Sequence, residues 1–305
     1  MLNLSPARVR VLLAALVAGS LPAVPVCAQP GTTAPARERK TMVKFSLVTD
    51  KPATPGGTFT LGLRYVIADG WHTYWDGLND TGMPASWQLE LPPGWTAGEA
   101  QWPAPHRYGM ENGVVDHVYL NEATILIPIS VPSSAEFGDA SIKVNSKWLV
   151  CQEACIPERG ESEVNVQVID RPANQPVPAA IQKTRDRAIV TGWGELDKLK
   201  PESSLKDAQL SVKVPGATKL AFFPAKDSSP AEDLIAEGEV SSDTLTVQMH
   251  QRKGEQLAVR GVIEVARKSE TGTKTSWHYI DFTPGVSVDD AATTASPAKP
   301  AAKTE

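Results

Sequence analysis

Short runs in which apolar and polar residues alternate recur along most of the chain. Alternation with a period of two places one face of a strand on a core and the other face in water. In the first half, such runs predict strands at 43–48, 58–66, 87–91, 124–129, 142–150 and 164–168. In the second half, they predict strands at 210–214, 219–223, 245–249, 258–265 and 277–282. We therefore expect an all-β chain: an antiparallel, immunoglobulin-like β-sandwich followed by a second, smaller β-domain.

A proline-rich segment separates the two groups of strands and predicts a linker with a short helix. Pro172, Pro176 and Pro178 close the first group, and a helix-compatible stretch begins at Ala179 and runs toward Leu199. The extreme C-terminal residues, rich in Ala, Thr, Pro and Lys, lack the apolar side chains that would offset the entropy cost of ordering them.

The N-terminus carries the pattern of a secretory leader. Arg8 and Arg10 precede an apolar run that ends in Val26-Cys27-Ala28, which predicts a signal peptide cleaved near Ala28. The run contains two prolines and is shorter than the about 20 apolar residues that a membrane-spanning helix needs. Cys27 then leaves with the leader, although a lipoprotein would instead keep it as the acylated residue. The exported chain is expected in the periplasm, an oxidising compartment.

The predicted organisation follows from these three patterns. It consists of a signal peptide (1–28), a disordered segment (29–40), the sandwich domain (41–171), a linker with a helix (172–204), the second β-domain (205–284) and a disordered tail (285–305). The formal net charge is -5, with acidic and basic residues mixed along the chain. This pattern offers no basic stripe for nucleic acid, so nucleic acid is not an expected partner.

Cys151 and Cys155 are expected to be the two cysteines left after export, and their spacing has three possible meanings. They can form a structural staple, a redox-active pair or part of a metal site. A disulfide across four residues requires a tight turn, because a straight strand would separate the two Cα atoms by about 13 Å. We expect this turn at the edge of the sandwich, with both sulfurs exposed. A loop this short stabilises a fold by only about 2 kcal/mol, so the redox interpretation is favoured over the staple.

Neighbouring residues bear on the other two interpretations. His106, His117, Met83 and Met110 could add soft ligands to the cysteines, but they do not stand at metal-site spacing, so neither a metal nor a cofactor is predicted. Glu153 lies between the cysteines, and Glu158 follows them. Nearby carboxylates disfavour a thiolate, which predicts a slow nucleophile that works within defined protein complexes.

Three ordered blocks resemble one family: Asp69-Gly-Trp-His-Thr-Tyr-Trp75, Trp102-Pro-Ala-Pro-His-Arg-Tyr-Gly109 and Trp148-Leu-Val-Cys-Gln-Glu-Ala-Cys-Ile-Pro-Glu158. Over about residues 42–170 the chain resembles the N-terminal periplasmic domain of the thiol:disulfide interchange protein DsbD. It resembles more closely the related suppressor of copper sensitivity protein ScsB, and this resemblance suggests copper tolerance as a context. Leu220-Ala-Phe-Phe-Pro224 resembles the additional β-domain of the ScsB-like proteins.

The resemblance implies a dithiol relay. Cys151 and Cys155 match the family's pair, which takes electrons from a membrane or thioredoxin-like thiol–disulfide carrier and passes them to periplasmic acceptors. Cys155 is expected to form the mixed disulfides and Cys151 to resolve them. Tyr108, expected in a loop, is the candidate for an aromatic cap on the sulfurs, and Tyr74 and Trp75 fall where the family places aromatics beside the site.

Full-length members of that family continue into a membrane domain and a thioredoxin-like domain, which this sequence does not show. Whether the chain acts as an enzyme by itself therefore stays open. It can be a protein-disulfide reductase-like component whose partners lie on other chains. The alternative is a non-enzymatic periplasmic binding protein with a structural disulfide, for which copper is a candidate ligand.

Overall fold

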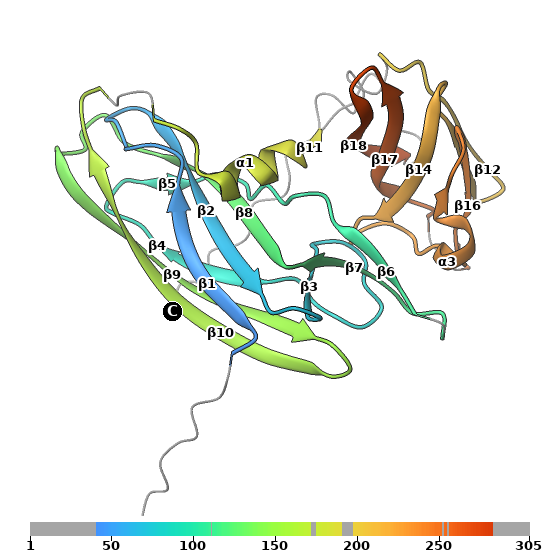
Figure 1. Cartoon of the computed structure of the whole chain (residues 1–305), viewed down its shortest axis with the longest axis horizontal. Helices are drawn as coiled ribbons and strands as arrows, with labels where there is room; N and C mark the ends of the chain where they lie inside the picture. The colour runs from blue at the N-terminus through green and yellow to red at the C-terminus, as the bar shows by residue number, and fades with distance from the viewer. Residues whose placement is uncertain are drawn as a thin grey trace, which may run out of the picture. The chain divides into compact units, whose positions relative to one another are not determined.

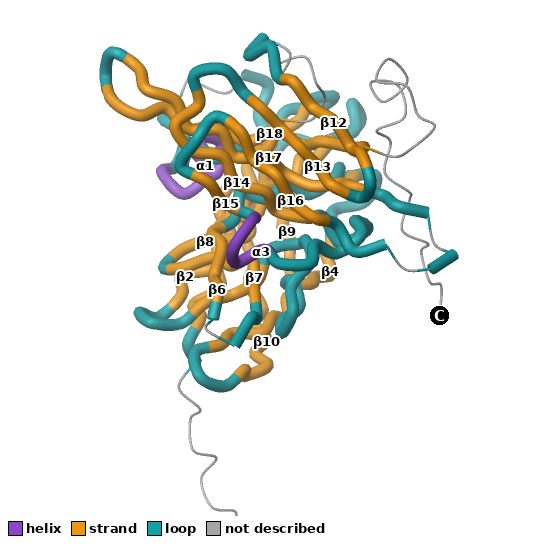
Figure 2. Tube along the Cα trace, turned by 90° about the vertical axis from the view of Figure 1, so that its right-hand side faces the viewer, coloured by secondary structure: helices purple, strands orange, loops and turns teal. Residues whose placement is uncertain are grey.

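A computed structural model describes residues 41–110, 112–171, 175–190, 198–251, 253–254 and 256–282. The predicted signal peptide, the predicted disordered segment that follows it and the predicted disordered tail lie outside these residues. Within them, strands far outnumber helices (Figure 2). The prediction of an all-β fold, with an immunoglobulin-like sandwich followed by a smaller β-region, is confirmed. The exact domain boundaries stay a prediction.

Two antiparallel sheets build the first region (Figure 1). The four-stranded sheet has the order β1 (Val43–Thr49), β2 (Thr58–Ile67), β8 (Glu122–Ser130) and β5 (Thr96–Ala97). The six-stranded sheet has the order β10 (Cys155–Val168), β9 (Gly138–Cys151), β3 (His72–Tyr74), β7 (Val115–Leu120) and β6 (His106–Gly109), and β4 (Ser86–Glu90) also pairs with β9.

Two further sheets build the second region. The five-stranded sheet has the order β11 (Ile189–Val190), β18 (Gly272–Phe282), β17 (Val259–Ser269), β14 (Ala217–Pro224) and β15 (Glu239–Val240). The three-stranded sheet has the order β12 (Glu202–Lys206), β13 (Gln209–Lys213) and β16 (Thr244–Gln248). A short helix, α3 (Leu234–Glu237), precedes β15.

The five-stranded sheet is buried on both faces, which explains the apolar run Leu220-Ala-Phe-Phe in β14. Leu220 and Phe222 belong to the core of the second region. Ala221 and Phe223 point the other way and belong to the large core that fills the first sandwich. Because strand residues alternate between faces, a strand covered on both sides reads as a continuous apolar run. The two regions therefore share one apolar core along this sheet.

The linker contains the helix α1 (Ala179–Asp186), which is shorter than the helix-compatible stretch. Its buried residues are Ile181 and Thr184, and the Thr184 hydroxyl donates to the carbonyl of Thr124 on β8 at 2.7 Å. The helix ends before the β-branched pair Ile189 and Val190, which forms β11 alongside β18. No helix among the described residues is long and apolar enough to span a membrane.

Candidate functional site

The two cysteines close the tip of the long β9–β10 hairpin (Figure 1). Cys151 ends β9, Cys155 begins β10, and the two residues face each other directly in the ladder with their Cα atoms 4.1 Å apart. A disulfide joins them. The tight turn that the spacing predicted is the three-residue loop 152–154. Pro157 is accommodated because β10 is an edge strand, where a missing N–H costs no ladder bond inside the sheet.

The two sulfur-bearing residues differ sharply in exposure. Cys151 is only 3% exposed, whereas Cys155 is an exposed residue. The expectation that both sulfurs lie exposed is therefore wrong for Cys151. Its side chain lies on the same sheet face as those of Tyr74 on β3 and Val118 on β7, which pack with it and cover it. An approaching thiolate meets Cys155 first.

A small group of apolar side chains backs the disulfide, and we name it the disulfide cluster. Buried Tyr74, Val118 and Cys151 form it, and the partly buried Tyr108 and Leu149 pack against it. Tyr108 lies on β6 and not in a loop as predicted, because residues 106–109 pair with β7 and extend the sheet by one short strand. Tyr108 thus reaches the neighbourhood of the cysteines from a strand edge.

His72 fills the space between the two tyrosines of the site. It pairs with Cys151 across β3 and β9, and its ring centroid lies 4.8 Å from that of Tyr108 and 5.4 Å from that of Tyr74. Burial lowers the pKa of His72, so the imidazole is neutral at pH 7. Its Nε2 is buried without a hydrogen-bond partner among the described residues. The His72 ring therefore packs between the rings of Tyr74 and Tyr108 as an uncharged aromatic group.

The Tyr74 hydroxyl is the polar group that contacts the exposed sulfur. Its oxygen lies 3.5 Å from Cys155 Sγ and 3.4 Å from Thr81 Oγ1. Burial raises the pKa of Tyr74 by more than the hydrogen bond to Thr81 lowers it, and the nearby Asp116 and Tyr108 add smaller increases, so the phenol keeps its proton at neutral pH. It can thus serve as a hydrogen-bond donor to sulfur.

A buried carboxylate completes this arrangement. Asp116 is fully buried and accepts hydrogen bonds from the Thr81 backbone N–H at 3.0 Å and from the Thr81 hydroxyl at 2.5 Å. Because the hydroxyl hydrogen of Thr81 goes to Asp116, Thr81 can only accept from Tyr74. The phenol hydrogen of Tyr74 is therefore shared between Thr81 and Cys155, and it can turn fully to the sulfur when that sulfur becomes a thiolate.

Gly82 holds the following loop against the back of this tyrosine. A Cβ at Gly82 would lie 2.0 Å from Cζ of Tyr74, closer than any side chain can approach. Only glycine permits this contact. The loop position brings Thr81 within reach of the phenol.

Trp75, predicted beside the site, lies in the large core of the first sandwich and is 5% exposed. Adjacent strand residues point to opposite faces, so Tyr74 and Trp75 cannot both face the disulfide. The Trp75 ring instead contacts His117, at 6.1 Å between centroids. By packing in this core, Trp75 anchors the chain segment that carries Tyr74.

The two acidic residues near the cysteines have different surroundings. Glu153 is exposed at the tip of the hairpin. The Glu158 carboxylate accepts hydrogen bonds from the backbone N–H groups of Met42 and Val43, at 2.7 and 3.1 Å, and from Trp148 Nε1 at 3.2 Å. Glu158 therefore ties the start of β1 to β10, and its charge is engaged there.

Two of these polar residues, Thr81 and Asp116, were not predicted from the sequence. Asp116 carries a usable signal, since it interrupts the apolar run Val114-Val-Asp-His-Val118. A charged residue within a buried strand needs a partner. Among the residues that the structure describes, no three His, Cys, Asp or Glu side chains cluster in a way that could hold a metal ion.

Several solved structures are similar to this chain. The N-terminal periplasmic domain of ScsB from Proteus mirabilis is 16% identical, with a TM-score of 0.46, over 77% of this chain and 91% of that chain. The reduced DsbD N-terminal domain of Neisseria meningitidis is 17% identical, with a TM-score of 0.25, over 40% and 84%. The complex of the DsbD and PilB N-terminal domains from Neisseria meningitidis is 17% identical, with a TM-score of 0.24, over 43% of this chain and 88% of that chain.

A family profile described as thiol:disulfide interchange protein DsbD, N-terminal, matches residues 44–167. A comparison with curated proteins gives no match. The matched residues contain the disulfide and every side chain of the disulfide cluster. The family match and the disulfide together suggest thiol–disulfide exchange. Residues 44–167 of this chain belong to the family of DsbD N-terminal domains.

Proposed function

We propose that this chain is a periplasmic dithiol relay, which takes electrons from a thioredoxin-like or membrane thiol–disulfide carrier and passes them to acceptor proteins. Cys151 and Cys155 are its redox pair, and Tyr74 and Tyr108 line the site. The observation that carries the proposal is the asymmetry of the disulfide: one exposed sulfur with a phenol beside it, and one buried sulfur behind it.

Reduction begins when a partner thiolate attacks Cys155 Sγ, the accessible sulfur. The new bond joins the partner to Cys155, the Cys151–Cys155 bond breaks, and Cys151 leaves as a thiolate that takes up a proton. A second thiolate of the partner then attacks the partner's own sulfur in the mixed disulfide and releases Cys155. Two electrons and two protons have passed to the chain, and the partner has become a disulfide.

The reduced pair passes the electrons on by the reverse sequence. The Cys155 thiolate attacks a disulfide of the acceptor, and buried Cys151 then attacks Cys155 Sγ to restore the intramolecular bond. The Tyr74 hydroxyl, 3.5 Å from Cys155 Sγ, donates to the thiolate each time it forms. Cys151 is well placed as the resolving residue because its contacts keep it away from solvent thiols.

A purely structural disulfide would be redundant at this position. The ladder of β9 and β10 runs without interruption from Gly138 and Val168 to the two cysteines. A hairpin held by that many pairs gains little from a bond that closes so short a loop, about 2 kcal/mol by chain entropy. The location at the exposed tip favours exchange over stapling.

Equilibration of the purified chain with redox buffers tests the proposal. The expected reduction potential lies above about -300 mV, in the range of exchange-active pairs, and a lower value would identify a structural bond. Copper or any other metal is not needed for this reaction.

Trapping experiments distinguish the two cysteines. Cys151→Ser leaves Cys155 exposed and is expected to accumulate mixed disulfides with a thioredoxin-like protein. Cys155→Ser is the matched control, since it leaves a thiol that is 3% exposed in the disulfide form and should trap far less. Equal trapping by both variants would contradict the assigned roles.

A further inference from the structure

Strand β6, which carries Tyr108, lies at the free edge of its sheet. Among the strands that the structure describes, it pairs only with β7, in the register His106 to Val118, Arg107 to His117, Tyr108 to Asp116 and Gly109 to Val115. A four-residue edge strand has few bonds to hold it. What lies on its other side therefore decides how firmly Tyr108 stays beside the disulfide.

The two faces of this strand pair meet different parts of the molecule. Tyr108 and its partner Asp116 face the disulfide cluster and the Tyr74 hydroxyl system. Arg107 and its partner His117 face the second region, where both contact the Phe223 ring. The guanidinium carbon lies 5.5 Å from the centroid of Phe223, and the His117 ring lies 5.5 Å from it. Adjacent residues of β6 thus touch the redox site and the second region.

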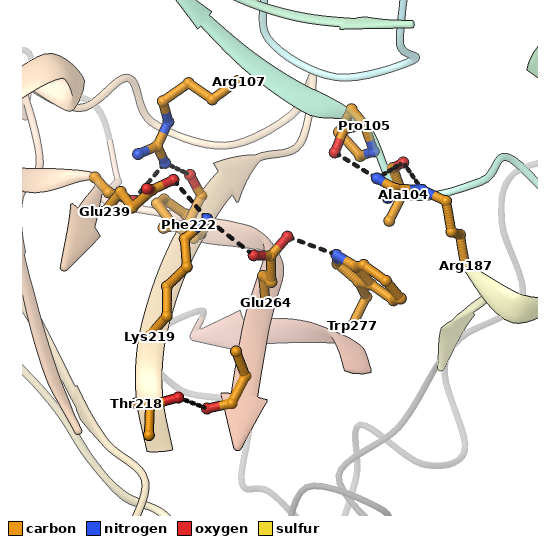
Figure 3. Close-up of polar contacts among 12 residues, drawn as sticks. Ala104, Pro105, Arg107, Arg187, Thr218, Lys219, Phe222, Glu239, Glu264 and Trp277 are labelled. Carbon is orange, nitrogen blue, oxygen red and sulfur yellow. Dashed lines mark hydrogen bonds and ion pairs between the residues drawn. The ribbon is translucent and has the colours of Figure 1, made fainter. Parts of the chain in front are cut away.

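Arg107 forms the direct tie between β6 and the second region (Figure 3). Its Nη2 donates to the carbonyl oxygen of Phe222 on β14 and to that of Gly238 at the end of α3. Lys219 stands nearby and pairs with Glu239 at 3.1 Å and with Glu264 at 3.2 Å. These carboxylates offset part of the positive charge of the guanidinium.

The tie is costly, which argues against a role in stability alone. Nε and Nη1 of Arg107 are buried and find no hydrogen-bond partner among the described residues. Burial lowers the pKa of Arg107 to about 10, so the group remains charged at pH 7 while it lacks full solvation. Apolar residues of similar size often stabilise such a position better than a buried charge. What arginine adds is a planar guanidinium whose Nη2 directs its two N–H groups at two carbonyl oxygens, an arrangement that we call the fork.

A second arginine fixes the segment that leads into β6. Arg187 follows α1 and donates to the carbonyl of Ala104, at 3.0 and 2.6 Å, and to that of Pro105 at 3.0 Å. Its guanidinium lies 4.8 Å over the Trp277 ring of β18, and Trp277 Nε1 donates to Glu264 at 2.9 Å. The approach to β6 and β6 itself are therefore both connected to the five-stranded sheet (Figure 3).

We propose that Arg107 is a positioning residue, through which the second region latches β6 and keeps Tyr108 packed beside the Cys151–Cys155 disulfide. The latch sets how tightly Tyr108 packs against the cluster that buries Cys151, and therefore how easily Cys151 leaves as a thiolate when a partner attacks the exposed Cys155. This inference rests on the proposed function. It gives the second region a part in the reaction, since the region holds in place a side chain that packs against a disulfide outside that region.

The test measures how fast dithiothreitol reduces the oxidised full chain, with acid quenching, alkylation and mass spectrometry. Arg107→Gln removes the charged donor, and Arg107→Lys keeps the charge but loses the fork. Loss of charge-assisted hydrogen bonds to two carbonyls should raise the rate constant of reduction roughly tenfold in the glutamine variant and less in the lysine variant. The matched control is Arg159→Gln, which removes the same charge from an exposed position on β10.

A variant on the opposite side of the latch tests the same idea without a change in β6. A Cβ at Gly238 would lie 2.7 Å from the backbone oxygen of Leu234 and 2.8 Å from Nη2 of Arg107, so Gly238→Ala should push the end of α3 and the guanidinium apart and also raise the rate. In the Arg107→Gln, Gly238→Ala double variant the two effects should not add, because each breaks the same tie. The reduction potential should stay at the wild-type value in all variants, since reduction and reoxidation both accelerate.

Three results separate the possible failures. Wild-type rates in Arg107→Gln and Gly238→Ala, with a lowered melting temperature, would overturn the latch and leave Arg107 a structural residue. An equal acceleration in Arg159→Gln would overturn it as well, because the effect would then be one of charge. A wild-type reduction potential below about -300 mV would instead refute the relay on which the latch depends.

Discussion

The hydroxyl of Tyr74 should control how readily Cys155 forms a thiolate. Tyr74→Phe removes one oxygen and leaves the ring in place against Gly82 and the disulfide cluster. The lost contact is the hydrogen bond of 3.5 Å to Cys155 Sγ. In the reduced protein this bond stabilises the thiolate more than the thiol, because a charged acceptor binds a donor more strongly.

The expected size of the effect follows from the net value of one hydrogen bond. At about 1 kcal/mol, its loss lowers the thiolate population of Cys155 roughly fivefold at a pH where the thiol dominates. A less stabilised thiolate is also a better nucleophile by roughly twofold, given a Brønsted slope of about 0.4–0.5. The rate of mixed-disulfide formation should therefore fall by a factor of about 2.5.

The assay follows Cys155 alone. In the Cys151→Ser chain, with and without Tyr74→Phe, reaction with oxidised glutathione is quenched at intervals, and mass spectrometry quantifies the peptide that carries Cys155. Tyr65→Phe is the matched control, since Tyr65 is a buried phenol that bonds Ser146 Oγ at 2.8 Å. A Tyr74→Phe chain that reacts as fast as its parent, or no more slowly than the control, would refute the assigned role of the hydroxyl.

Three further predictions concern the surroundings of the site. Asp116→Asn takes one charged acceptor from Thr81, so the free energy of unfolding in urea should drop by about 1–3 kcal/mol; an unchanged midpoint would contradict the buried-carboxylate arrangement. Burial lowers the pKa of His117 to about 4, so the unfolded chain, with an imidazole pKa of about 6.5, binds more protons between these values. Stability should therefore fall by about 2 kcal/mol from pH 7 to pH 5, and equal urea midpoints at the two pH values would show that His117 does not behave in this way. Glu158→Ala deprives two backbone N–H groups and Trp148 Nε1 of their acceptor, and calorimetry should show a melting temperature roughly 5 °C lower, whereas an unchanged value would mean that these bonds contribute nothing net.

The sequence predicted the long strands because five or more alternating residues reveal a period of two. Strands such as β3 and β6 have three or four residues, too few to show any period, and prolines precede β6. That is why Tyr108 was expected in a loop. The same limit hid the face on which Trp75 lies, since alternation could be applied only once β3 was known.

The polar part of the site depends on contacts between distant residues. Thr81 and Asp116 are 35 positions apart and meet only because the loop after β3 folds back over β7. Arg107 and Gly238 are 131 positions apart. Local pattern contains no information on such pairs, although a charged residue within an apolar run, as at Asp116, indicates that a partner exists. The cysteine spacing, by contrast, needed only local geometry.

The apolar core shared along β14 has a practical consequence for anyone who divides this molecule. A fragment that stops near residue 171 would uncover the surface on which Phe223 and Trp277 rest, and it would lose Arg187 together with the carbonyl oxygens that Arg107 binds. Such a fragment would associate in solution through its uncovered apolar surface, and its β6 strand would hold Tyr108 less firmly. Rates measured on it would then describe an unrestrained sandwich, and the gap between those rates and the rates of the whole chain would measure what fusion of the two regions achieves.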